Sequence, residues 1–76
     1  RVEHALEERE LAEAIDRFLR TLPERECSMF LRRYWYVDSV QSIAARYAIK
    51  ENTAKSILFR TREKLRRYLA GEGILV

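Results

Sequence analysis

Apolar residues recur along this chain at the spacing of amphipathic helices, and no stretch shows the alternation typical of a strand. The first helical stripe consists of Leu11, Ile15, Phe18 and Leu22, at steps of four, three and four residues. Its beginning near Val2–Leu6 is less sharply marked, because acidic residues crowd one another just after it. Pro23 ends this helix and favours the first turn of the next one, where its missing N–H leaves no hydrogen bond unmade.

A second helix is predicted after Pro23, with acidic residues in its first turn, where the helix dipole favours them. Its apolar stripe consists of Cys27, Phe30, Leu31 and Tyr34. A break at Val37–Asp38 follows it. We expect Trp35 and Tyr36 to be half-buried packing residues, and we expect the core to include Phe18, Leu22, Phe30 and Leu31.

The remaining pattern predicts a short helix and a long one. Ser39 is a suitable N-cap for the short helix, because its hydroxyl can accept from a free N–H of the first turn. The apolar positions of this helix are Val40, Ile43, Ala44 and Tyr47. The chain then turns at Ala48–Ile49, and the long helix runs from about Glu51 with apolar residues Ala54, Ile57, Leu58, Leu65 and Leu69 and with Thr61 between them. Gly71 is predicted to take the left-handed conformation that closes this helix, and Glu72–Val76 is left unassigned.

A short helix, a tight turn and a longer basic helix form a helix-turn-helix over residues 39–70. Small side chains are needed where the two helices cross, which Ala44 and Ala45 provide. Ile49 is expected to fill the turn, and Ala54 with Ile57 or Leu58 to face it. The chain is therefore predicted to be all-α, a compact bundle of about four helices forming one domain over residues 1–76. Because it opens inside a helical run without an initiator Met, we expect it to be a fragment of a longer protein, from its C-terminal part.

Charge is segregated between the two halves of the chain. Residues 1–38 carry seven Lys/Arg and nine Asp/Glu, a net charge of −2, whereas residues 39–70 carry eight Lys/Arg and two Asp/Glu, a net charge of +6. A basic half of this kind is typical of a surface that faces phosphates, although it also occurs on ordinary solvated helices.

Other classes of function have little support. The lone Cys27 excludes an internal disulfide or a cysteine-based metal site and is compatible with a reducing cytoplasm. His4 stands alone in the acidic opening segment, so neither a metal nor a cofactor is expected. Catalysis has no support either, since the sequence has no Cys/His pairing, no phosphate-binding glycine loop and no carboxylate pair in an apolar setting. No apolar run approaches the roughly 20 residues of a membrane span, and we expect no membrane partner.

The first turns of the long helix are the candidate DNA-reading segment, because that end of a recognition helix enters the major groove. The residues predicted to contact bases are Lys50, Glu51, Asn52, Lys55 and Ser56. Asn pairs with adenine, Glu accepts from cytosine and Lys reaches guanine. Farther along the helix, Arg60, Arg62, Lys64, Arg66 and Arg67 are candidates for phosphate contacts, which position a protein without specifying sequence.

From Leu22 onward the chain resembles region 4 of the sigma-70 family of bacterial RNA polymerase sigma factors. The motifs that carry the resemblance are Leu22–Glu26 (LPERE), Phe30–Trp35 (FLRRYW), Ser42–Ala44 (SIA), Asn52–Ser56 (NTAKS) and Arg60–Arg66 (RTREKLR). They occur in the family's order and spacing over about fifty residues. The resemblance implies recognition of the promoter −35 element in duplex DNA as part of the polymerase holoenzyme. It also implies contact with the flap of the polymerase β subunit through an apolar groove, a surface that an anti-sigma factor can use as well.

The chain departs from the family at several positions. Ser42 replaces a common Glu, Ala48 a usual Gly, Lys50 a frequent Ser or Thr cap, Asn52 a frequent Gly and Ile57 a frequent Arg. Most of these positions lie where DNA is contacted, so they bear on the target sequence more than on the fold.

Three residues and two alternative functions stay open at this stage. Thr53 either binds a phosphate or supports the start of the helix, and Arg32 and Arg33 either reach the DNA backbone or are ordinary surface arginines. The alternatives are a response-regulator type of helix-turn-helix, which lacks the run from Leu31 to Trp35, and a helical interaction module that binds an acidic partner through its basic face.

Overall fold

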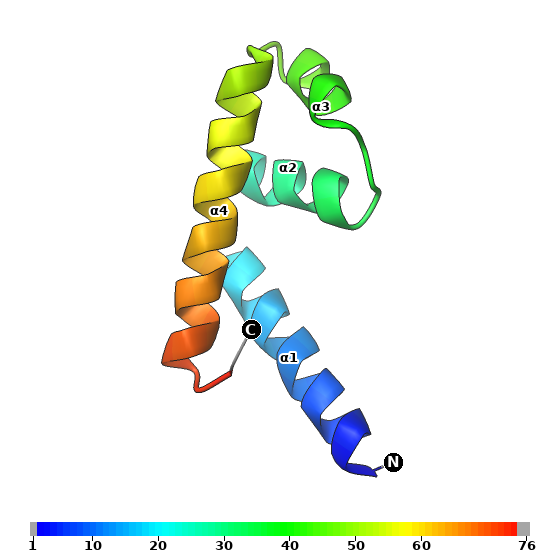
Figure 1. Cartoon of the computed structure of the whole chain (residues 1–76), viewed down its shortest axis with the longest axis vertical. Helices are drawn as coiled ribbons and strands as arrows, with labels where there is room; N and C mark the ends of the chain where they lie inside the picture. Colours follow the sequence, from blue (N-terminus) through cyan, green and yellow to red (C-terminus); the bar gives the residue numbers. More distant parts are fainter. Residues whose placement is uncertain (1, 75–76) are drawn as a thin grey trace.

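The computed structural model describes residues 2–74, and their side chains from Glu7 onward, so the side chain of His4 lies outside the described part. The chain forms four helices, α1 (Val2–Arg20), α2 (Glu24–Tyr34), α3 (Val40–Arg46) and α4 (Glu51–Gly71), and the described residues contain no strand. The predicted all-α class is confirmed. The molecule is elongated, with extents of 44 × 23 × 18 Å, because α4 runs along most of its length while the other three helices pack against it (Figure 1).

The helix boundaries around Pro23 differ from the predictions. α1 ends at Arg20, so Leu22 lies in the turn and not on the helical stripe. The cause is Pro23, which disfavours a helical conformation in the residue before it. Pro23 itself occupies the N-cap position, with φ −55° and ψ 147°, and α2 begins one residue later.

The core lies where α2, α3 and α4 meet. Its buried residues are Met29, Ile43, Ala44, Ala54 and Leu58. Met29 is completely buried, although the sequence analysis did not single it out. Among the residues expected in the core, Phe18 and Phe30 are buried, whereas Leu22 and Leu31 are half-buried. Cys27 is also half-buried.

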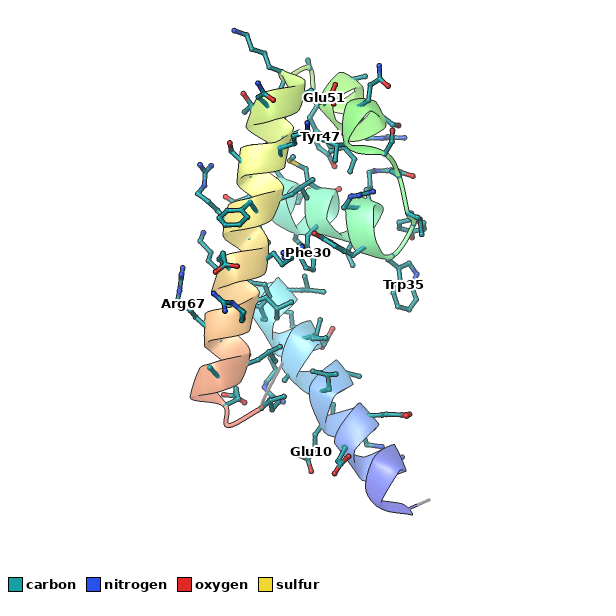
Figure 2. The ribbon with its side chains drawn as sticks, in the orientation of Figure 1. Glu10, Phe30, Trp35, Tyr47, Glu51 and Arg67 are labelled. Carbon is teal, nitrogen blue, oxygen red and sulfur yellow. The ribbon has the colours of Figure 1, made fainter. Side chains whose placement is uncertain are left out.

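The aromatic segment after α2 was predicted wrongly. Trp35 and Tyr36 are 76% and 66% exposed, and Val37 beside them is 76% exposed (Figure 2). The chain leaves α2 here and runs along the surface to α3, so nothing covers these side chains. Large apolar side chains exposed in succession often mark an interaction surface.

Two helices end in the same way, through a residue with positive φ. After α3, the N–H of Ala48 donates to Ala45 O and that of Ile49 to Ala44 O, and Ala48 has φ 54°. After α4, Gly73 donates to Ala70 O and Ile74 to Leu69 O, and Gly73 has φ 80°. These paired bonds define the Schellman motif. The prediction for Gly71 was therefore wrong, since Gly71 is still helical and Gly73 takes the left-handed conformation.

We expect Ala48→Gly to stabilise the domain by about 1 kcal/mol, because the left-handed conformation strains an L-residue and not glycine. For a domain of this size the melting temperature should rise by about 4–8 °C. Urea unfolding followed by circular dichroism measures the change. Ala45→Gly, at an exposed position inside α3, is the matched control and should destabilise the domain by about 1 kcal/mol. Equal effects of the two substitutions would contradict this explanation.

Candidate nucleic-acid interface

α3, its turn and α4 form the helix-turn-helix. Ser39 caps α3 by accepting a hydrogen bond from the N–H of Ser42 at 3.0 Å, so the cap forms without the glutamate that the family commonly has there. Ala44 is buried in the core with Ala54 and Leu58, and Ile49 packs against the same cluster from the turn. Ala45, predicted to lie at the helix crossing, is exposed instead, because the close approach uses only one of the two alanines.

The five residues predicted to contact bases are all exposed in the first two turns of α4 or directly before them. Glu51 Oε1 and Lys55 Nζ lie 3.8 Å apart on this surface. Lys50 holds the N-cap position of α4 without a side-chain hydrogen bond. The N-terminal end of α4 therefore presents exposed polar side chains, among them Glu51 (Figure 2).

Phe59 is an exposed residue of this surface that the sequence analysis missed. It is 60% exposed in the middle of α4. It follows Asn52 by seven residues, Lys55 by four and Ser56 by three, so helix geometry places all four on one face. The spacing of Phe59 from these three residues could have identified it from the sequence as part of the exposed face. It was not recognised there, because Phe59 was not distinguished from the apolar residues beside it in the sequence. We call Asn52, Lys55, Ser56 and Phe59 the reading face.

Apart from Lys55, the basic residues of α4 and of its N-cap fall into two groups. Lys64 Nζ lies 3.6 Å from Glu26 Oε1 of α2, and Arg66 Nη2 lies 2.5 Å from Glu63 Oε1. Within residues 7–74, by contrast, no ion pair involves Lys50, Arg60, Arg62 or Arg67. Arg67 projects from the side of α4 away from α2 (Figure 2). The second group is thus charged and exposed without a carboxylate beside it.

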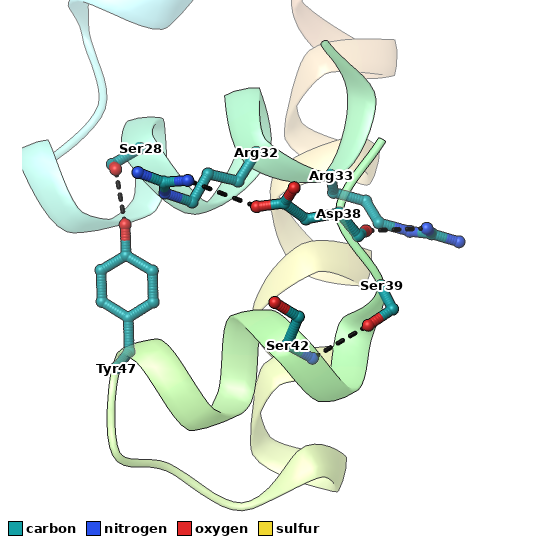
Figure 3. A network of polar contacts seen from close by, with 7 residues as sticks. All are labelled: Ser28, Arg32, Arg33, Asp38, Ser39, Ser42 and Tyr47. Atoms are coloured by element: carbon teal, nitrogen blue, oxygen red, sulfur yellow. Dashed lines mark hydrogen bonds and ion pairs between the residues drawn. The ribbon is translucent and has the colours of Figure 1, made fainter. Parts of the chain in front are cut away.

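Arg32 and Arg33 hold the loop between α2 and α3 (Figure 3). Arg32 Nη1 lies 3.3 Å from Asp38 Oδ2, and Arg33 Nη1 donates to the backbone oxygen of Asp38 at 3.1 Å. The loop also contains Val37 with φ 59°, a strained conformation for a β-branched residue. Ser28 and Tyr47 share a hydrogen bond between α2 and α3 nearby. Both arginines thus have structural partners, and their predicted contact with DNA phosphates stays a prediction.

The comparison with protein families decides the class of this domain. The model of the family Sigma-70, region 4 matches residues 18–67, fifty of the 76 residues. The chain belongs to this family. Searches of curated proteins and of solved structures found no match.

The chain is therefore a region 4 domain, a helix-turn-helix class of DNA-binding domain that acts in transcription. The match covers the last residues of α1, all of α2 and α3, and most of α4. It includes every residue predicted to contact bases or phosphates. No helix within the described residues is long and apolar enough to cross a membrane.

The region 4 domain also has an apolar groove of about 750 Å³, whose edge at Arg62 lies about one helical turn along α4 from Phe59 of the reading face. Three helices and the segment after α2 form its walls. The apolar lining residues are Ala12, Ile15 and Leu19 of α1, Phe30, Leu31, Tyr34, Trp35 and Tyr36 in and after α2, and Leu65 of α4. Asp16 and Arg62 provide the charged groups at its edge. An open apolar groove with little polar lining fits an amphipathic helix.

Proposed function

We propose that this domain recognises the −35 element of a bacterial promoter through the start of α4 while its apolar groove docks on the flap of the polymerase β subunit. The observation that carries the proposal is that one small domain exposes two surfaces of different chemistry. Exposed polar side chains gather at the N-terminal end of α4, and exposed apolar side chains line the groove beside α1 and α2. A protein that joins DNA to polymerase needs both.

Base recognition is assigned to the reading face together with Lys50 and Glu51. Asn52 has the donor and acceptor that match adenine, and Lys55 can donate to guanine. The ring of Phe59 can contact the methyl group of thymine, which is an apolar form of base recognition. Ser56 lies between these residues on the same face and can donate or accept.

Contacts with the DNA backbone are assigned first to the cations nearest the reading face that have no ion pair among the described residues. These cations are Lys50, Arg60 and Arg62. At 1.5 Å per residue, Arg66 lies about 22 Å along the helix from Glu51, whereas the major groove is about 8.5 Å deep. Arg66 and Lys64 are predicted phosphate contacts that need the helix to lie along the groove, and both have a carboxylate partner. Thr53 is exposed at the start of α4, where its hydroxyl can donate to a phosphate.

Selection from a randomised duplex library, with polymerase core present, tests the proposal. We expect a single asymmetric site of the −35 type. Two inverted half-sites about one helical turn apart would favour a dimeric regulator instead. Selection of no duplex, together with binding of an acidic protein, would favour the interaction module.

Asn52→Ala should change which sequences the domain prefers. We expect discrimination at one base pair to fall by about ten-fold, within the range for loss of one bidentate contact. Arg60→Ala is the control, because loss of a phosphate contact should lower the affinity equally on all sequences. Both residues are exposed, so neither change should unfold the domain. Fluorescence anisotropy on the selected site and on single-base variants measures both effects, and identical profiles for the two variants would contradict the assigned roles.

A further inference from the structure

The position of α1 depends mainly on the end of α4. α1 packs against α4, and its residues Ala14 and Phe18 are buried. Phe18 contacts the ring of Tyr68, with ring centroids 5.6 Å apart. Figure 1 shows the C-terminal end of α1 beside the lower half of α4 and the rest of α1 diverging from it, while the chain after α4 turns back toward α1. The α1 wall of the groove is thus supported from α4.

A polar contact adds to the packing of α1 against α4. Arg17 Nη2 donates to Glu72 Oε1 at 2.8 Å. The neighbouring side chain of Tyr68, and then that of Glu72, raise the pKa of the Arg17 guanidinium above its ordinary value. One charged side chain of α1 therefore contacts the last turn of α4 and the residue that follows it. We call Arg17, Tyr68 and Glu72 the Arg17 bridge.

The bridge lies on the side of α1 opposite the groove. At about 100° per residue, Arg17 points about 140–160° away from Ala12, Ile15 and Leu19, which line the groove. A contact in that position does not touch a ligand in the groove, but it restrains rotation of α1 about its crossing with α4. Because the turn at Thr21–Pro23 holds only one end of α1, rotation of this helix changes the width of the groove.

We propose that the Arg17 bridge sets the orientation of α1 and thereby keeps the groove open at the width that the β flap needs. Arg17, Tyr68 and Glu72 are then positioning residues for polymerase docking, and this inference rests on the proposed function of the groove. All three lie outside residues 18–67, the part of the chain that matches the family. The Schellman motif at Gly73 fixes the backbone directly after Glu72 and so helps to place its carboxylate.

Binding of a bacterial β flap fragment to the full chain, followed by Trp35 fluorescence, tests this inference. Trp35 lines the groove and is the only tryptophan of the chain. We expect Arg17→Glu to weaken flap binding by about five-fold, since an exposed ion pair is lost and replaced by repulsion from Glu72. The double variant Arg17→Glu with Glu72→Arg should restore the affinity to within about two-fold, because it re-forms the pair in reverse.

Arg9→Glu is the matched control. It makes the same charge change on the same helix, and Arg9, like Arg17, lies four residues from Glu13. Both single variants should lose equal affinity for duplex DNA, so a loss of flap binding specific to Arg17→Glu reports on the groove. Equal flap affinities of the Arg17→Glu and Arg9→Glu variants, or no recovery in the double variant, would overturn the role of the bridge. If the parent chain itself fails to bind the flap, the proposed docking is wrong and this inference falls with it.

Discussion

Raising the salt concentration from 50 to 200 mM is expected to lower the affinity of the domain for duplex DNA by about 40- to 150-fold. Each phosphate that a cation neutralises releases counterions, so the logarithm of the affinity falls with the logarithm of salt at a slope of about −0.9 per phosphate. Lys50, Arg60 and Arg62 are exposed, lie close to the reading face and have no ion pair among the described residues. Three to four contacts of this kind give the range stated.

The slope also distinguishes the unpaired cations from the paired ones. Seven cations are predicted from the sequence to contact phosphates, namely Arg32, Arg33, Arg60, Arg62, Lys64, Arg66 and Arg67. If all of them did so, the slope would be steeper, near −6. Arg62→Gln should reduce the steepness by about one, whereas Arg20→Gln, which removes an exposed arginine from α1, should leave it unchanged. Fluorescence anisotropy titrations at four or five salt concentrations measure the slope. Binding that is insensitive to salt on every duplex would refute the DNA-binding surface proposed here.

Trp35→Ala is expected to weaken binding of the β flap by about 30-fold, in the range for loss of a central aromatic residue from an interface. Trp35 is 76% exposed and lines the apolar groove beside Leu31 and Tyr34. Figure 2 shows its side chain projecting from the segment after α2 on the side where α1 lies. Its burial by a partner would remove a large apolar area from water, which is the main favourable contribution to such binding.

Val37→Ala is the control for this prediction. Val37 is as exposed as Trp35 and belongs to the same segment, but it does not line the groove. Because Trp35→Ala removes the fluorescent reporter, calorimetry measures both affinities, and circular dichroism verifies that both variants stay folded. Trp35→Ala and Val37→Ala variants that bind the flap equally well would place docking elsewhere on the domain.

The residues that take the left-handed conformation after α3 and α4 were not fully predictable from the sequence. The left-handed residue after α4 is Gly73, although Gly71 stands closer to the end of the apolar pattern. A helix can continue for one more turn without an apolar residue, so the period alone does not locate its end. In the turn after α3, the left-handed residue is Ala48 and not a glycine. Packing of Ile49 against the core outweighs the local strain at Ala48.

The burial of individual aromatic residues was also not fully predictable from the sequence. Phe18, Phe30, Trp35, Tyr36 and Phe59 are all large and apolar, yet only the first two are buried. For Phe59 the helical face was readable from its spacing to Asn52, Lys55 and Ser56. For Trp35 and Tyr36 no period applies, because the helix ends at Tyr34 and the next one starts six residues later.

The sequence by itself determined the all-α class, the approximate position of the four helices, the helix-turn-helix and the family, because these follow from local periodicity, caps and motifs in order. It also indicated which polar residues are exposed at the start of α4. Tertiary structure alone decided that Met29 is completely buried, that Lys64 pairs with Glu26, and that α1, α2 and α4 line an apolar groove. It also placed Arg17 beside Tyr68 and Glu72. These features join residues far apart in the chain, and the angle at which two helices cross, which brings such residues together, is set by packing and not by any one helix.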